Sequence, residues 1–249
     1  MPFPDTVSEQ ARRSLAGVKL APYWLDRAER PPACAPLSGE VEADLAVVGA
    51  GFSGLWTAYL ARQRFPDWKV VLLECDRVAE GATGRNGGFV SASLTHGIAN
   101  GMARWPEEMP ELVRLGQENI ECIDVTVREE GIDCDFLRSG EMVAAVEDYQ
   151  VANLERLYDL AADVGAETEL LDADDARALV DSPTYRGALL DRRGVAMADP
   201  ARLAWGLADA CRRHGVVIHE GTPVRDVEPE GHVLRLSCDG GSEIGRAHV

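Results

Sequence analysis

A strand–helix–strand pattern near the start of the chain constrains its fold more than any other feature. Residues 45–48 (LAVV) are continuously apolar, as in a strand buried on both faces of a parallel sheet. Residues 52–64 place apolar side chains on one side, as in a helix, and Pro66 follows its end. A second strand is expected over 69–74 (KVVLLE). Three such elements within about thirty residues predict one parallel β–α–β unit.

Three glycines occupy the turn between the first strand and the helix, at Gly49, Gly51 and Gly54. The first permits a tight turn, the second lets a pyrophosphate approach the backbone, and the third lets the helix pack closely on the strand. The helix N-terminus adds free N–H groups and the positive end of its dipole. Glu74 ends the second strand, where a carboxylate accepts hydrogen bonds from ribose hydroxyls and repels a 2′-phosphate. The pattern predicts an adenine-dinucleotide site that disfavours NADP, with a purely structural glycine turn as the weaker alternative.

A second glycine-rich loop, residues 81–88 (GATGRNGG), lies just past this carboxylate. Glycine and asparagine tolerate positive φ, so the loop can turn sharply. Its N–H groups, together with Thr83 and Arg85, are candidates to surround a second stretch of phosphate or a ribityl chain. A plain NAD-binding unit needs no such loop, so the sequence favours FAD over NAD. An ordinary surface loop does not explain this composition.

Residues 44–90 resemble the FAD-binding start of the D-amino-acid-oxidase-type flavoproteins, a family that includes glycine and sarcosine oxidases. The similarity lies in DLAVVGAGFSGLWTAYLA and in VVLLECDRVAEGATGRNGGFV. The loop GATGRNGG is most similar to the gamma-glutamylputrescine oxidase-like branch, and residues 23–26 (YWLD) also resemble that branch. The resemblance covers nearly all of 20–240 and implies FAD as the cofactor.

A later segment is similar to the second FAD-binding segment of the same family. It comprises residues 199–203 (DPARL), 215–219 (GVVIH) and 221–224 (GTPV). In the family, the residue that matches Val224 offers its backbone to the adenine. The loop at 81–88 contains neither His nor Cys, which favours noncovalent FAD. Motifs and resemblance together give these candidate cofactor-binding residues: Gly49, Gly51, Phe52, Ser53, Gly54, Glu74, Ala82, Thr83, Arg85, Asn86, Gly87, Gly88 and Val224.

The resemblance implies an α/β fold, in which a Rossmann-like FAD-binding parallel sheet carries an inserted α+β substrate domain, truncated at the C-terminus. The expected parts are an N-terminal arm (1–40), a first FAD-binding part (41–100), the start of the substrate domain (101–194), a second FAD-binding part (195–242) and a non-native tail (243–249). Apolar periodicity and capping residues predict further helices over 107–130, 150–164, 173–180 and 200–214. Residues 23–25 of the arm form an apolar cluster that is expected to dock on the main body.

The family oxidises the C–N bond of an amine or amino acid. FAD accepts a hydride from the carbon that bears the amine, the imine hydrolyses, and the reduced flavin passes electrons to oxygen or another acceptor. Family members are much longer than this chain, and residues 243–249 do not resemble them. We therefore expect a truncated gene model that alone binds FAD poorly and has no turnover. An NAD-dependent Rossmann dehydrogenase and a non-catalytic flavoprotein fragment are the alternatives.

The sequence assigns no catalytic residue. His96 lies beyond the glycine-rich loop, but a lone histidine is more often a surface or packed residue. Four arginines are possible partners of a substrate carboxylate, although solvated charge is the favoured interpretation: Arg104, Arg138, Arg186 and Arg192. The acidic run from Asp172 to Asp175 is better explained by helix capping than by a metal.

The net charge and the cysteine content indicate which partners and which cellular compartment to expect. The formal net charge of −17 disfavours nucleic acid and anionic lipid. The six cysteines show no C-x-x-C spacing, which argues against a metal site and for mostly buried thiols in the cytoplasm. No apolar run approaches the length of a membrane span. The expected partner is a small-molecule amine or amino acid.

Overall fold

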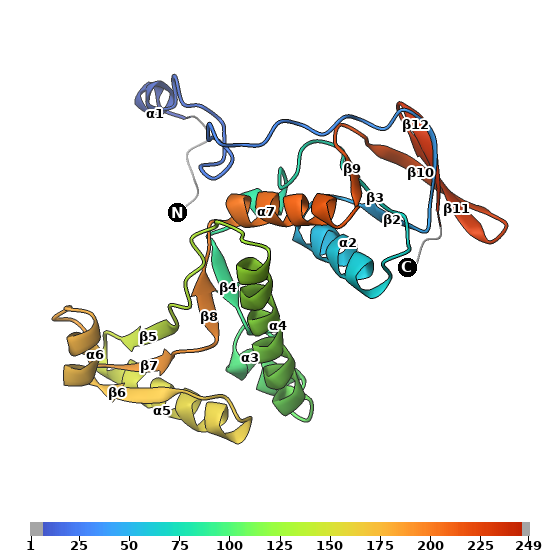
Figure 1. Cartoon of the computed structure of the whole chain (residues 1–249). Helices are drawn as coiled ribbons and strands as arrows, with labels where there is room; N and C mark the ends of the chain where they lie inside the picture. Colours follow the sequence, from blue (N-terminus) through green and yellow to red (C-terminus); the bar gives the residue numbers. More distant parts are fainter. Residues whose placement is uncertain (1–6, 246–249) are drawn as a thin grey trace.

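The computed structural model describes residues 7–245. Its elements are, in chain order, α1 (Glu9–Ser14), β1 (Gly39–Ala43), β2 (Leu45–Val48), α2 (Phe52–Arg64), β3 (Val70–Leu73), the short 3₁₀ helix η1 (Ala82–Gly84), β4 (Phe89–Ser91), α3 (Ile98–Arg104), α4 (Met109–Glu129), β5 (Glu141–Ala145), α5 (Asp148–Asp163), β6 (Glu169–Asp172), α6 (Ala173–Leu179), β7 (Gly187–Asp191), β8 (Val195–Met197), α7 (Pro200–Arg213), β9 (Val217–His219), β10 (Val224–Glu230), β11 (Val233–Cys238) and β12 (Gly241–Gly245). Figure 1 shows them in two groups joined by β4 and β8.

The expected β–α–β unit is confirmed. Strands β2 and β3 pair in parallel around α2, and β9 pairs in parallel with β3 on its other side. Helices α2 and α7 lie together beside this sheet (Figure 1). The predicted cap of α7 is also present, because the Asp199 side chain accepts hydrogen bonds from Ala201 N and Arg202 N.

Strand β3 carries the core of this group because it has packing partners on both faces. Val70 and Leu72 belong to one apolar cluster with residues of α2 and α7. Val71 and Leu73 belong to a second cluster with residues of β1, β10 and β11. Successive residues of a strand point to opposite faces. The parallel sheet is therefore packed between two helices and a second sheet, of order β1–β12–β11–β10.

The expectation that residues 45–48 are buried on both faces was wrong at Val48. Its side chain is 58% exposed, whereas all four residues of β3 are buried. The reason is the strand order β2–β3–β9, which puts β3 in the middle and β2 at an edge. A continuous apolar run does not reveal which strand of a sheet is the central one.

The second group consists of the antiparallel sheet β5–β7–β6, with α5 and α6 packed on it. Its own small core includes Ala145, Leu154 and Leu189. Strands β4 and β8 pair antiparallel and, with α3 and α4, join this group to the helices α2 and α7 (Figure 1). The predicted boundaries at 100–101 and 194–195 fall within these connecting segments, and the domain division stays a prediction.

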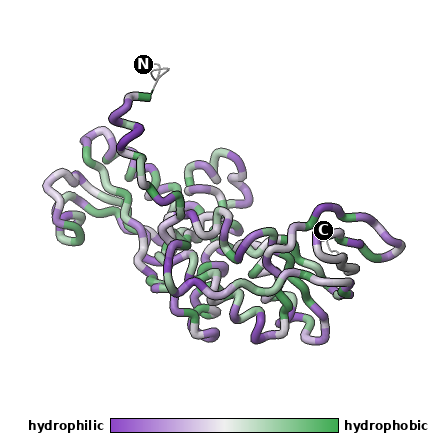
Figure 2. The backbone as a smooth tube through the Cα atoms, turned by 90° about the horizontal axis from the view of Figure 1, so that it is seen from above, coloured by the Kyte–Doolittle hydropathy of each residue, from purple (hydrophilic) through white to green (hydrophobic). Residues whose placement is uncertain are grey.

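The two ends of the chain differ in their packing. Helix α1 buries no residue and stands away from the rest of the molecule, as Figure 2 shows. Residues 23–37 run back along the main body and contact it at several points described below. At the other end, residues 243–245 belong to β12, which pairs with β1 and β11. The remainder of the predicted tail, 246–249, lies outside the described residues.

The expectation of mostly buried thiols was wrong. Cys134 and Cys211 are buried, while Cys75 and Cys122 are exposed. Cys75 follows the end of β3, and Cys122 lies on the outer face of α4, so neither packs into a core. Across residues 7–245, no helix has both the length and the apolar character that crossing a membrane requires.

Candidate functional site

Only glycine fits at two positions around the start of α2, one in the turn before the helix and one in its first turn. Gly49 has φ of 98°, in the left-handed region. A Cβ at Gly54 would lie 1.9 Å from the carbonyl oxygen of Gly49, so a side chain there would force the helix off the strand. Gly51 caps α2 without any side-chain hydrogen bond. The N-cap residue therefore occupies none of the free N–H groups of the first turn of α2 with a side chain of its own.

The second glycine-rich loop lies directly against this turn. The backbone N–H of Phe52 donates to Thr83 Oγ1 at 3.0 Å. Thr83 Oγ1 would also lie 3.1 Å from a Cβ at Gly51. Two segments that are about thirty residues apart in sequence thus form one surface at the N-terminus of α2.

Asn86 gives the loop its shape. Its side-chain amide donates to the carbonyl of Thr83 at 2.7 Å and its oxygen accepts from Gly88 N at 2.8 Å. Gly88 has φ of 79°, and a Cβ there would lie 2.4 Å from the carbonyl oxygen of Ala198. The end of the loop is therefore tied to the residue just before the cap of α7.

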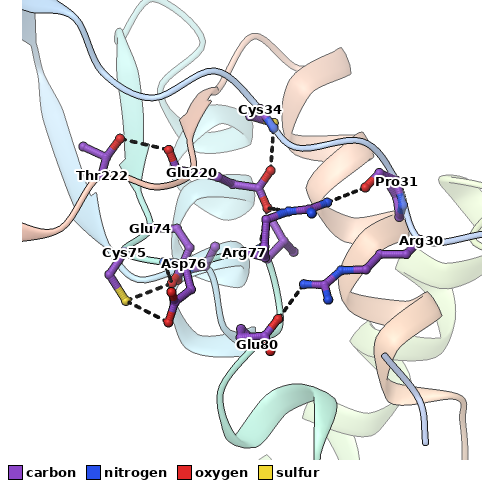
Figure 3. A network of polar contacts seen from close by, with 12 residues as sticks. Arg30, Pro31, Cys34, Glu74, Cys75, Asp76, Arg77, Glu80, Glu220 and Thr222 are labelled. Carbon is purple, nitrogen blue, oxygen red and sulfur yellow. Dashed lines mark hydrogen bonds and ion pairs between the residues drawn. The ribbon is translucent and has the colours of Figure 1, made fainter. Parts of the chain in front are cut away.

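Glu74 is fixed at the end of β3, next to the glycine turn. The N–H of Ala50 donates to Oε2 at 2.7 Å, and the N–H of Asp76 donates to Oε1 at 2.9 Å. The Cys75 thiol also donates to this carboxylate, and that hydrogen bond raises the pKa of Cys75. Oε1 thus has two donors, and Oε2 keeps a lone pair for a ribose hydroxyl. Figure 3 shows Glu74 among its neighbours.

The segment that leads to Val224 lies beside Glu74. The N–H of Thr222 donates to the carbonyl of Glu74 at 2.8 Å, and the N–H of Gly221 donates to the carbonyl of Asp76 at 2.9 Å. Val224 begins β10 two residues later. The structure thus gathers the glycine turn, the second loop, Glu74 and the approach to Val224 at the carboxyl ends of β2 and β3, where open parallel sheets bind ligands.

Two further candidate cofactor-binding residues are Arg85 and Ser53. The Arg85 guanidinium donates to the carbonyl of Glu80 at 2.8 Å and lies 3.8 Å from its carboxylate. Its contact with phosphate stays a prediction. Ser53 lies exposed on the first turn of α2.

A cavity of about 420 Å³ lies at the far end of β4, bounded by α3, α4, α5 and strands β5, β7 and β8. Its volume is within the range of small-molecule sites, about 300–1,000 Å³. His96 lines it, with the carboxylate-bearing residues Glu141 and Asp191. None of its lining residues is Lys or Arg.

The four arginines considered for a substrate carboxylate lie outside this cavity. Three pair with acidic side chains: Arg138 with Glu121 and Asp124, Arg186 with Asp148, and Arg192 with Glu169. Arg104 packs over the ring of Trp105. The interpretation of Asp172 as a helix cap is confirmed, because its side chain accepts from Asp174 N and Asp175 N.

A partly buried carboxylate at the end of α4 connects this helix to α2 and α7. Glu130 accepts hydrogen bonds from Tyr59 Oη at 2.8 Å and Arg213 Nη2 at 2.8 Å, and it lies 2.7 Å from His214 Nε2. Desolvation raises the pKa of Glu130, but hydrogen bonds from these three partners outweigh it and lower the pKa to about 2. Sequence patterns could not reveal this site, because its members come from α2, α4 and α7.

Sequence reasoning also missed how the arm contacts the loops. Arg27 forms an ion pair of 2.7 Å with Asp199, whose side chain is only 3% exposed. Glu220 is buried and accepts from Val78 N at 2.6 Å and from Arg77 Nε at 3.1 Å. The N–H of Cys34 also donates to Glu220 (Figure 3). The one sequence signal for these contacts was the apolar cluster at 23–25, which predicts that the arm docks on the main body.

Comparisons with known proteins agree with this geometry. The sequence model of a family described as "DAO: FAD dependent oxidoreductase" matches residues 44–249. A gamma-glutamylputrescine oxidoreductase of Escherichia coli K12 is 36% identical over 197 residues, which are 77% of this chain and 45% of that protein. A probable oxidoreductase of Haemophilus influenzae is 30% identical over 85% of this chain and 49% of its own length. The chain spans about half the length of the curated relatives it matches.

Solved structures show the same fold at lower identity. Glycine oxidase from Geobacillus kaustophilus superposes with a TM-score of 0.66 at 20% identity, over 83% of this chain and 54% of its own. An L-amino acid deaminase from Proteus vulgaris, with an insertion deleted, has a TM-score of 0.70 at 18% identity, over 90% of this chain and 57% of its own.

Proposed function

Because this chain belongs to the DAO family of FAD-dependent oxidoreductases, we propose that it holds the ADP half of FAD in an enzyme that oxidises the C–N bond of an amine or amino acid. The observation that carries the proposal is the joint surface of the α2 N-terminus and the loop 82–88, with Glu74 beside it. The match to an FAD-dependent family favours FAD over NAD as the cofactor.

The residues at this surface fit the cofactor. The first turn of α2, with Gly51, Phe52 and Ser53, would bind the pyrophosphate, which would take over the N–H of Phe52 from Thr83 Oγ1. Glu74 would accept hydrogen bonds from the ribose hydroxyls, and the backbone of Val224 would face the adenine. Gly51 bears no side chain, so a phosphate group would approach its backbone without steric hindrance from that residue.

An apolar row next to the loop would receive the flavin ring. Phe89 pairs with Met197 across β4 and β8, and Leu137 forms a bridge with Met197 from the other side. Directly opposed residues point to the same face of a sheet. Phe89 and Leu137 are 71% and 62% exposed, so this face is open one residue after Gly88. When bound there, FAD would accept a hydride from the carbon that carries the amine.

The cavity beyond β4 supports an amine as the substrate. Its charged lining groups are Glu141 and Asp191, and an ammonium group is stabilised by carboxylates. The arginines that might have bound a carboxylate pair elsewhere, which favours an amine over an amino acid recognised through its carboxylate. The relatives named above act, by their names, on gamma-glutamylputrescine, glycine and L-amino acids.

We also propose the division into an FAD-binding domain (41–100 and 195–242) and the start of a substrate domain (101–194). The separate small core of Ala145, Leu154 and Leu189 supports it, while Val127, Ile132 and Cys134 of residues 101–194 pack into the cluster around β3. The cytoplasmic location inferred from the thiols remains part of the proposal.

Activity can be tested with the protein made from the complete reading frame that contains this chain. Under anaerobic conditions, a panel of amines and amino acids is mixed with the enzyme and the flavin absorbance is followed. Bleaching by at least one amine, with hydrogen peroxide or a reduced dye formed on adding an acceptor, is expected. A bound flavin that no amine or amino acid reduces would show a non-catalytic flavoprotein instead.

A further inference from the structure

The N-terminal arm lies on the backbone of the second glycine-rich loop. The indole N–H of Trp24 donates to the carbonyl of Asn86 at 2.8 Å. Leu25 is buried, and a Cβ at Gly84 would lie 2.7 Å from its Cδ2 atom. Two consecutive side chains of the arm therefore contact the middle of the loop, one through a hydrogen bond and one through close packing.

The same stretch of arm also reaches both ends of the loop. Arg30 pairs with Glu80 at 2.5 Å, and Glu80 in turn accepts from Arg85 through its carbonyl. Arg27 pairs with the buried carboxylate of Asp199. The neighbouring Ala198 donates its N–H to the carbonyl of Gly88 at 2.9 Å. Residues 24–30 thus contact the loop or its supports at the beginning, in the middle and at the end.

The arm is anchored to the body separately from these contacts. The N–H of Leu37 donates to Thr222 Oγ1 at 2.9 Å, and the N–H of Cys34 donates to the buried Glu220. Arg77 bridges Glu220 and the carbonyl of Pro31 (Figure 3). These anchors involve residues 31–37, which follow the loop-contacting residues 24–30 in sequence, so loss of one loop contact leaves the arm attached.

We propose that residues 24–30 are a clamp that holds the loop 80–88 in the conformation that receives FAD, with Trp24 and Leu25 as positioning residues. The proposal rests on the proposed FAD site. Four of the loop's residues are glycines, and glycine loses the most conformational freedom on ordering. A loop ordered in advance by the clamp avoids that loss when FAD binds. The clamp acts on the loop backbone and needs no contact with the cofactor.

The test uses Trp24→Phe, which keeps the ring and removes the N–H donor, in the protein from the complete reading frame. Its FAD dissociation constant is expected to rise roughly fivefold, the effect of one net hydrogen bond. Turnover at saturating FAD should stay unchanged, because the clamp touches no reacting atom. Leu25→Ala should raise the constant further. The matched control is Arg13→Met, which removes an exposed ion pair with Glu9 within α1 of the same arm, outside residues 24–30.

A second readout separates the clamp from the FAD site itself. Hydrogen exchange in the apoprotein is expected to speed up at the amides of residues 82–88 in Trp24→Phe and Leu25→Ala, and to stay as in the wild type in Arg13→Met. Unchanged exchange in both clamp variants would overturn the proposal. A rise in the FAD dissociation constant of the same size in Arg13→Met would also overturn it. A wild-type protein that binds no FAD would refute the proposed function, while exchange would still decide whether the clamp orders the loop.

Discussion

Replacing Glu130 by Gln is expected to loosen the connection between α4 and the helices α2 and α7. The carboxylate is 12% exposed and receives Tyr59 and Arg213, with His214 alongside. Glutamine keeps one acceptor oxygen but loses the charge and turns an NH₂ group towards cationic or donor partners. An unsatisfied buried donor is costly, so the change should destabilise the folded protein at neutral pH.

The magnitude follows from the pKa of Glu130. A fall from 4.5 to about 2 is a difference of about 2.5 units, which at 1.36 kcal/mol each gives an upper limit of about 3.4 kcal/mol. Arg213 and His214 are 47% and 40% exposed, and solvent screening of such partners reduces the effect to about 2 kcal/mol. Since the pKa is lower in the folded state, this stability is present above pH 4.5 and is lost as the pH falls towards 2.

Denaturant unfolding of wild type and Glu130→Gln, measured at several pH values, checks both the size and the sign. The difference between them should be largest at neutral pH and should shrink steadily below pH 4.5. Glu118→Gln is the matched control, because that residue forms an exposed pair with Arg114 on the same helix and should change stability little. A difference in unfolding free energy between the two proteins that stays constant from neutral pH to below pH 4.5 would refute the reasoning.

Two substitutions and one labelling experiment test the site and its surroundings further. Gly54→Ala places a Cβ 1.9 Å from the Gly49 carbonyl, so the purified protein should lose its flavin and melt earlier; normal flavin content would contradict the packing described. Glu74→Gln removes a charged acceptor and should weaken FAD binding roughly tenfold in a fluorescence titration, whereas unchanged affinity would remove Glu74 from the site. Burial raises the pKa of Cys211 to about 12, so a thiol reagent should label Cys122 rapidly and Cys211 only on unfolding.

Local patterns were sufficient for the elements that position the cofactor. The β–α–β unit, the long helix α4 and the capped helix α7 are specified by periodicity, by glycines and by Asp199, all of which act within a few residues. The same is true of the loop 81–88, whose shape depends on Asn86 and Gly88. Short elements were harder to predict from the sequence. Helix α3 follows His96 and Gly97, which both have positive φ, and its seven residues carry no capping side chain.

Features that depend on distant segments could not be predicted. The exposure of Val48 depends on which strand is central, and the low pKa of Glu130 depends on side chains from two other helices. The contacts of Trp24 and Arg27 join residues that are separated by 62 and 172 positions, respectively, from their partners. No local pattern encodes such a pairing. The resemblance identified the family from the sequence. Only the structure showed how the arm, the loop 81–88 and the N-terminus of α2 contact one another.

The most direct test of the account is the identity and amount of the cofactor that copurifies with the protein from the complete reading frame. After denaturation, the released compound is separated by chromatography and compared with FAD, FMN, NAD and NADP standards. The account predicts FAD in close to equimolar amount, released without covalent attachment and strongly reduced in Gly54→Ala. A protein that carries a nicotinamide dinucleotide, or that remains without flavin when FAD is supplied in excess, would contradict it.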